Sequence, residues 1–70
     1  MLTGPAIGVL GQLSAREHEI AAMAVSGLSG RQIGDRLFLS PRTVENYLHR
    51  AYAKVGASNR QELARYFPAD

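Results

Sequence analysis

One short stretch of the chain gathers polar side chains that are suited to bonding with nucleic-acid bases. At helical spacing, five of them fall on one side: Arg42, Glu45, Asn46, His49 and Arg50. An asparagine amide can bond bidentately to adenine, a glutamate can accept from the cytosine amino group, and an arginine prefers guanine or phosphate. A carboxylate on such a strip also repels phosphates unless the helix is in register. The stretch therefore predicts recognition of base edges in double-stranded DNA.

The same stretch carries an apolar face opposite the polar one. Val44, Leu48, Ala51 and Val55 are spaced by 4, 3 and 4 residues, which is the repeat of one side of an α-helix. This spacing predicts a helix that buries one face and presents the polar strip to solvent. A single helix of this length is marginal in water, so it requires partner helices.

Serines mark where these helices begin. A capping box pairs a serine at the N-cap with Glu or Gln three residues later, and each side chain bonds to the other's backbone N–H. Three segments have this pattern: Ser14–Glu17, Ser29–Gln32 and Ser58–Gln61. Ser40 lacks the acid but precedes Pro41, and proline is favoured at the first helical position. These signals predict helices at about 15–26, 30–37, 41–54 and 59–66.

Glycine and proline predict where the helices end. Gly27 and Gly56 follow the first and third helices, where a left-handed residue is favoured, and Pro68 follows the fourth. No alternating run of β-branched or aromatic residues indicates a strand, so we expect an all-α fold, a compact four-helix domain. The other apolar residues expected to meet in its core are Ile20, Met23, Ala24, Val25, Leu28, Ile33, Leu37, Leu63 and either Tyr66 or Phe67.

The connection between the second and third helices is short. The second helix is expected to end at Leu37, and after Phe38 and Leu39 a new N-cap follows at once at Ser40. So tight a link forces two helices to cross steeply, which is the geometry of a helix-turn-helix. In that motif the second helix lies in the major groove and contacts bases from its N-terminal part.

The composition limits the function classes. The 70-residue chain has a net charge of +2 and no cysteine, which excludes a disulfide framework, a thiolate nucleophile and a cysteine-based zinc site. No secretory signal is recognisable and no apolar run approaches the roughly 20 residues of a membrane span, so a cytoplasmic protein is expected. Residues 31–60 contain six of the eight basic residues against Asp35 and Glu45 alone, and such a basic segment favours a polyanionic partner.

Catalysis and cofactor binding find no support among the polar residues. The serines at the helix starts are accounted for as caps, and Glu17 and Glu19 by capping and the helix dipole. His18 and His49, the two histidines, do not make a metal site without a third ligand. We therefore expect no enzyme activity, no metal and no cofactor.

In order and spacing, the chain from Leu13 to Leu63 resembles the LuxR-type (GerE-like) DNA-binding domain of bacterial transcription regulators. The matching stretches are 13–17 (LSARE), 27–29 (GLS), 32–34 (QIG), 36–40 (RLFLS), 43–46 (TVEN), 54–56 (KVG) and 58–60 (SNR). Three positions depart from the common pattern: Gly30 stands where Asn is usual, Gly34 where Ala is usual, and Tyr47 where His is frequent. The resemblance implies the C-terminal effector domain of a larger regulator, binding DNA as a homodimer, with RNA polymerase as a further partner.

The resemblance also implies roles for individual residues. Base contacts are expected from Glu45, Asn46 and His49. Phosphate contacts are expected from Arg31, Arg42, Thr43, Arg50 and Lys54. The fourth helix is expected to be the dimerisation element, through Arg60, Leu63 and Ala64.

The expected organisation is a linker or frayed start over residues 1–12, followed by the DNA-binding domain over residues 13–67. Two alternatives remain open. A promoter-reading fragment similar to part of a sigma factor shares the helix-turn-helix. A helical protein-interaction module predicts no salt-dependent DNA affinity, whereas a groove reader that contacts several phosphates loses affinity steeply as salt rises.

Overall fold

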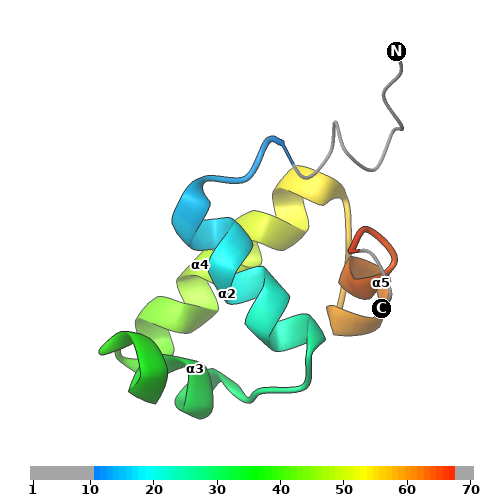
Figure 1. The fold of residues 1–70 in the computed structure, drawn as a ribbon. Helices are drawn as coiled ribbons and strands as arrows, with labels where there is room; N and C mark the ends of the chain where they lie inside the picture. Colours follow the sequence, from blue (N-terminus) through cyan, green and yellow to red (C-terminus); the bar gives the residue numbers. More distant parts are fainter. Residues whose placement is uncertain (1–10, 68–70) are drawn as a thin grey trace.

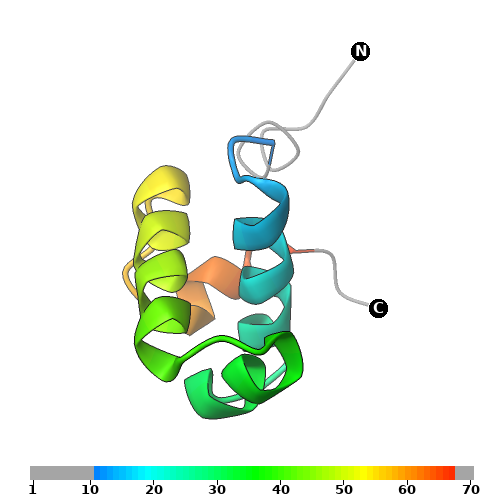
Figure 2. The ribbon, with the colours of Figure 1, turned by 90° about the vertical axis from the view of Figure 1, so that its left-hand side faces the viewer.

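The computed structural model describes residues 11–67, which form four α-helices and no strand: α2 (Ala15–Val25), α3 (Gly30–Leu37), α4 (Pro41–Val55) and α5 (Arg60–Ala64). The expected all-α class is thus confirmed. Helices α2 and α4 lie side by side and run in opposite directions, and α3 lies across the end where α2 finishes and α4 begins (Figures 1 and 2). The expected linker falls outside the described residues except for its last two positions, and Pro68 also falls outside them.

The first three helices begin as the sequence predicts. The Ser14 hydroxyl accepts from the Glu17 N–H at 3.1 Å, and the Glu17 carboxylate accepts from the Ser14 N–H at 2.9 Å. Ser29 and Gln32 form the same reciprocal pair at the start of α3, with the same two distances. Ser40 caps α4 ahead of the proline at its first position. Both capping boxes are therefore confirmed.

The start of the fourth helix differs from the prediction. Asn59, not Ser58, is the N-cap of α5, and its Oδ1 accepts from the Glu62 N–H at 2.9 Å. The Glu62 carboxylate in turn accepts from the Ser58 N–H at 2.7 Å, while Gln61 is exposed. Asparagine is as good an N-cap as serine, and a carboxylate accepts a stronger hydrogen bond than an amide. The N-cap is therefore one residue later than predicted, and the predicted Ser58–Gln61 capping box is wrong.

The helix ends lie close to the predicted ones, except in α5. Helix α2 ends at Val25 and α4 at Val55, each within one residue of the prediction. Gly27 and Gly56 have φ angles of 107° and 77°, so both expected left-handed stops are confirmed. Helix α5 ends at Ala64 because the next three N–H groups bond to carbonyls three residues earlier, at 3.0–3.1 Å. That is the tighter 3₁₀ pattern often found at a helix end.

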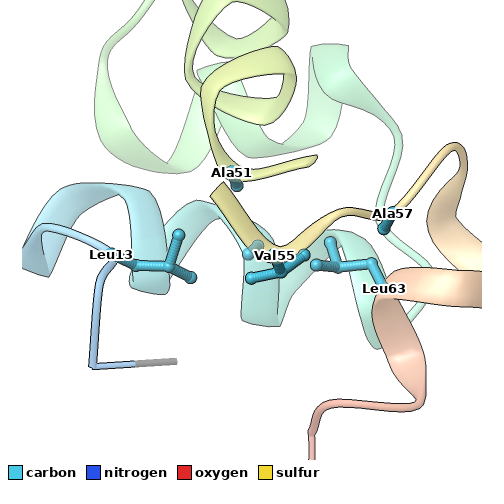
Figure 3. Packing of buried hydrophobic residues seen from close by; sticks show 6 residues of the cluster. Leu13, Ala51, Val55, Ala57 and Leu63 are labelled. Carbon is cyan, nitrogen blue, oxygen red and sulfur yellow. The ribbon is translucent and has the colours of Figure 1, made fainter. Parts of the chain in front are cut away.

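The core consists of two clusters of buried side chains, joined by α4. The first contains Leu13, Ala21, Ala51, Val55, Ala57 and Leu63 (Figure 3). The second contains Ile20, Ala24, Ile33, Val44 and Leu48. All four apolar positions predicted on the third helix are buried, and they supply two residues to each cluster. Of the other expected core residues, several are only partly buried and pack at the margins: Met23, Val25, Leu28, Leu37, Tyr66 and Phe67.

None of the four helices in residues 11–67 combines the length and the hydrophobicity that a membrane span requires.

Candidate nucleic-acid interface

The turn between α3 and α4 brings the two helices very close together. The Leu39 N–H donates to the Gly34 carbonyl at 2.9 Å across this turn. A Cβ atom added to Gly34 would lie 2.4 Å from the Leu39 carbonyl oxygen, well inside contact distance. The side chain of Leu39 is partly buried and packs against the second core cluster. The absence of a side chain at Gly34 therefore sets how closely the start of α4 approaches α3.

The five polar residues singled out on α4 all lie on its exposed side: Arg42, Glu45, Asn46, His49 and Arg50. The opposite side is the buried face already described. Within the strip, the His49 Nε2 atom lies 3.6 Å from the Glu45 Oε1 atom, one helical turn away. The three expected base-contacting residues thus share one continuous surface, and two of them touch.

An aromatic ring supports one end of this strip. The Arg50 guanidinium lies 5.8 Å from the centre of the Tyr47 ring. Tyr47 is half-buried and packs against the second core cluster. A guanidinium over an aromatic face is attracted by the ring quadrupole, so Tyr47 restrains the direction of Arg50. The Tyr47 ring thus both supports the strip and packs at the margin of the core.

The expected phosphate contacts are spread over both helices of the motif. Arg31 is exposed in the first turn of α3, and Arg42 is exposed in the first turn of α4. Thr43 is partly buried, and its hydroxyl accepts from the Ser40 hydroxyl at 2.9 Å. Four of the five residues, including Arg50, therefore lie on α3 or on the first ten residues of α4.

Lys54 lies near the far end of α4 and has a partner that the sequence did not predict. Its Nζ atom is 2.7 Å from the Glu17 Oε1 atom, and the Glu17 side chain is only 5% exposed against 41% for Lys54. The hydrogen bond from Lys54, followed by the one from the Ser14 N–H, holds the pKa of Glu17 below its ordinary value, although burial acts in the opposite direction. The two residues are 37 positions apart, so no local pattern indicates this pair.

The expected dimerisation residues are largely occupied inside the domain. The Arg60 guanidinium donates to the Leu28 carbonyl oxygen at 2.6 Å, tying α5 to the turn after α2. Leu63 is fully buried in the first core cluster, and Ala64 is partly buried. Among the residues of α5, Gln61 is exposed. Leu63 therefore supports α5 from within and offers no side-chain surface to a second copy.

These elements define the class of the protein. A short helix, a tight turn and a second helix with one buried and one polar face make a helix-turn-helix, the arrangement that presents a helix to a DNA groove. This is the motif that the short connection around Phe38 predicted.

Comparison with known proteins identifies the family. The sequence profile described as bacterial regulatory proteins, luxR family, matches residues 11–67. The DNA-binding transcriptional activator DevR/DosR of Mycobacterium tuberculosis is 38% identical over 55 residues, which are 79% of this chain and 25% of that protein. The C4-dicarboxylate transport transcriptional regulatory protein DctR of Rhodobacter capsulatus is 49% identical over 49 residues, 70% of this chain and 25% of that protein.

A longer relative gives the same result. A protein of Mycobacterium bovis named as an HTH-type transcriptional regulator is 42% identical over 53 residues, 76% of this chain and 6% of its own length. No solved structure matches the chain significantly. The chain therefore belongs to the luxR family of bacterial regulatory proteins and carries its DNA-binding helix-turn-helix domain. It spans a quarter or less of the length of these three relatives.

Proposed function

We propose that this domain recognises double-stranded DNA with α4 in the major groove, as the C-terminal effector part of a bacterial transcription regulator. The observation that carries the proposal is the division of α4 into two faces. Val44 and Leu48 are buried, while Glu45, Asn46 and His49 between and beside them are exposed. In a helix-turn-helix, the N-terminal part of the second helix meets the base edges. Glu45 and Asn46 lie in that part of α4, and His49 lies one turn beyond Glu45.

In the proposed complex, the bases are contacted by Glu45, Asn46 and His49. The Asn46 amide is suited to adenine and the Glu45 carboxylate to the cytosine amino group. The His49 Nε2 atom lies 3.6 Å from the Glu45 Oε1 atom, so the two side chains can contact neighbouring bases. Of the three, Asn46 carries the side chain best suited to a bidentate base contact.

In the same complex, Arg31, Arg42, Thr43, Arg50 and Lys54 hold the phosphates. Arg31 and Arg42 lie in the first turns of the two helices of the motif, where backbone N–H groups also favour anions. Lys54 must meet a phosphate while it holds Glu17 at 2.7 Å. Its charge is then shared, so we expect a smaller electrostatic contribution from Lys54 than from the arginines.

Two copies are proposed to bind half-sites about one helical turn apart, related by a two-fold axis. In this homodimer α5 supplies the contact through Ala64 and its exposed neighbours Gln61 and Arg65. Arg60 and Leu63 act by fixing α5 on the domain. RNA polymerase is a further partner in the proposal, and the cytoplasm, at the nucleoid when DNA is bound, is the compartment. The proposal includes no catalysis.

The test is a fluorescence anisotropy titration of the folded domain with a mixed-sequence DNA duplex, at low salt and again at higher salt. The expected result is binding whose affinity falls with a log–log salt slope of about −0.9 for each phosphate contact. A salt-independent interaction, or none at tens of micromolar, would contradict the proposal and favour the protein-interaction module. A positive result leads to selection of the preferred site from a random-sequence library.

A further inference from the structure

We propose that Phe38 packs against the deoxyribose rings of the DNA backbone, beside the groove that α4 enters. The residue has no part in the base or phosphate contacts described above. The inference rests on the proposed DNA binding and adds an apolar backbone contact to it. Such a contact increases the affinity for DNA of any base sequence.

Phe38 is unusual within residues 11–67 in two ways. Its side chain is 95% exposed, and no other large hydrophobic side chain in residues 11–67 is exposed. It is also the one non-glycine residue there with a positive φ, at 59°. A bulky side chain is disfavoured in the left-handed region, where glycine and asparagine are tolerated. The backbone of the turn therefore does not favour phenylalanine, and the ring contacts no core cluster that would stabilise it.

Phe38 lies beside the end of α4 that is proposed to meet DNA. The residue is the C-cap of α3 and lies two positions before Ser40, the N-cap of α4. The turn therefore lies at the N-terminal end of α4 (Figures 1 and 2). That end approaches the bases most closely in a helix-turn-helix complex. A side chain that projects from the turn beside it meets the wall of the groove, which is made of sugars and phosphates.

The charges around Phe38 favour DNA over an apolar protein surface. Arg36 in the last turn of α3 and Arg42 in the first turn of α4 are both exposed and bracket Phe38 in the sequence. An apolar ring flanked in the sequence by two exposed cations suits a backbone on which apolar sugar faces alternate with anionic phosphates. A hydrophobic pocket of a protein would have to desolvate the two guanidinium groups at a high free-energy cost.

The test compares Phe38→Asn and Phe38→Tyr with the unmodified chain, using mixed-sequence duplex DNA and fluorescence anisotropy over a range of salt. Asparagine tolerates the left-handed backbone, so the Phe38→Asn variant should keep or raise the melting temperature. Its affinity should fall on the order of fivefold for every sequence, with the salt slope unchanged because no charge is removed. Phe38→Tyr should bind as the unmodified chain does.

The controls separate this inference from the proposed function. Arg42→Ala should weaken binding and flatten the salt slope by about one unit. If it does so while Phe38→Asn binds normally, the inference fails and the proposed function stands. If the unmodified chain does not bind, both fail. A lower melting temperature for Phe38→Asn would assign the ring a structural role, and a loss abolished by replacing thymine with uracil would assign it to a base methyl; either result overturns the backbone contact.

Discussion

The Lys54 Nζ atom lies 2.7 Å from the Glu17 Oε1 atom and ties the last turn of α4 to the first turn of α2. The same Glu17 carboxylate accepts from the Ser14 N–H and so also completes the capping box of α2. One carboxylate thus joins the start of the domain to the end of the proposed DNA-reading helix. Lys54 therefore has a structural role in addition to any contact with phosphate.

We predict that Lys54→Met lowers stability, because Glu17 remains buried with only part of its hydrogen bonding. The expected loss is roughly 1–3 kcal/mol in the free energy of unfolding, measured by chemical denaturation. Arg16→Ala is the matched control, since it breaks the exposed Arg16–Glu19 pair at 3.4 Å and should change stability by less than about 1 kcal/mol. Equal effects of the two variants would show that the Glu17 pair is no stronger than a surface one.

The same variant should bind DNA with a nearly normal salt slope. Because the charge of Lys54 is shared with Glu17, we expect Lys54→Met to flatten the log–log slope by less than one unit, whereas Arg42→Ala flattens it by about one unit. Anisotropy titrations at several salt concentrations measure both slopes. A full unit lost in Lys54→Met would mean that Lys54 leaves Glu17 for a phosphate in the complex.

The Glu17 pair also predicts how stability depends on pH. The pKa of Glu17 is lowered in the folded state, chiefly by the hydrogen bond from Lys54. The resulting stabilisation is fully present above the unfolded-state pKa, about 4.3 for glutamate, and is lost as the pH falls through the lowered folded-state pKa. Melting temperatures from about pH 7 down to pH 3 should therefore fall more steeply for the unmodified chain than for Lys54→Met. Parallel curves would contradict this assignment.

Gly34→Ala should destabilise the helix-turn-helix. The new Cβ would lie 2.4 Å from the Leu39 carbonyl oxygen, which is backbone and moves only with the whole turn. We expect a loss of about 1–3 kcal/mol, as for other overpacked sites, together with weaker DNA binding. Gly30→Ala is the control, because its nearest neighbour, Glu45 Oε2, is 3.5 Å away; it should preserve stability or raise it by up to about 1 kcal/mol. Equal melting temperatures for the two variants would refute the role of close packing.

Asn46→Ala should change specificity more than overall affinity. If the amide bonds to one adenine, its loss costs roughly 1–3 kcal/mol at that base pair and relaxes the preference there. Selection from a random-sequence duplex library, performed with both proteins, measures the change. Gln61→Ala, an exposed polar substitution on α5, should leave the selected site as it is. An identical motif from Asn46→Ala would remove Asn46 from base recognition.

Much of the fold could be predicted because its signals are local. The serine caps, the two glycine stops and the spacing of Val44 and Leu48 each depend on residues within a few positions of one another. The error at Ser58 arose where two adjacent residues are equally good caps. The roles of the exposed residues on α4 remain predictions, since each depends on a DNA molecule that the chain alone does not contain.

The sequence by itself determined that the chain is helical, where three of its helices begin, which face of α4 is buried and that a tight turn precedes it. Capping bonds and helical periodicity involve residues within one or two turns of each other, so they can be recognised directly in the sequence. Only the tertiary structure decided that Lys54 pairs with Glu17, that Arg60 binds the Leu28 carbonyl and that Phe38 is left exposed. These outcomes depend on how the helices pack. Packing decides which residues from distant parts of the sequence come into contact, and which side chains stay exposed.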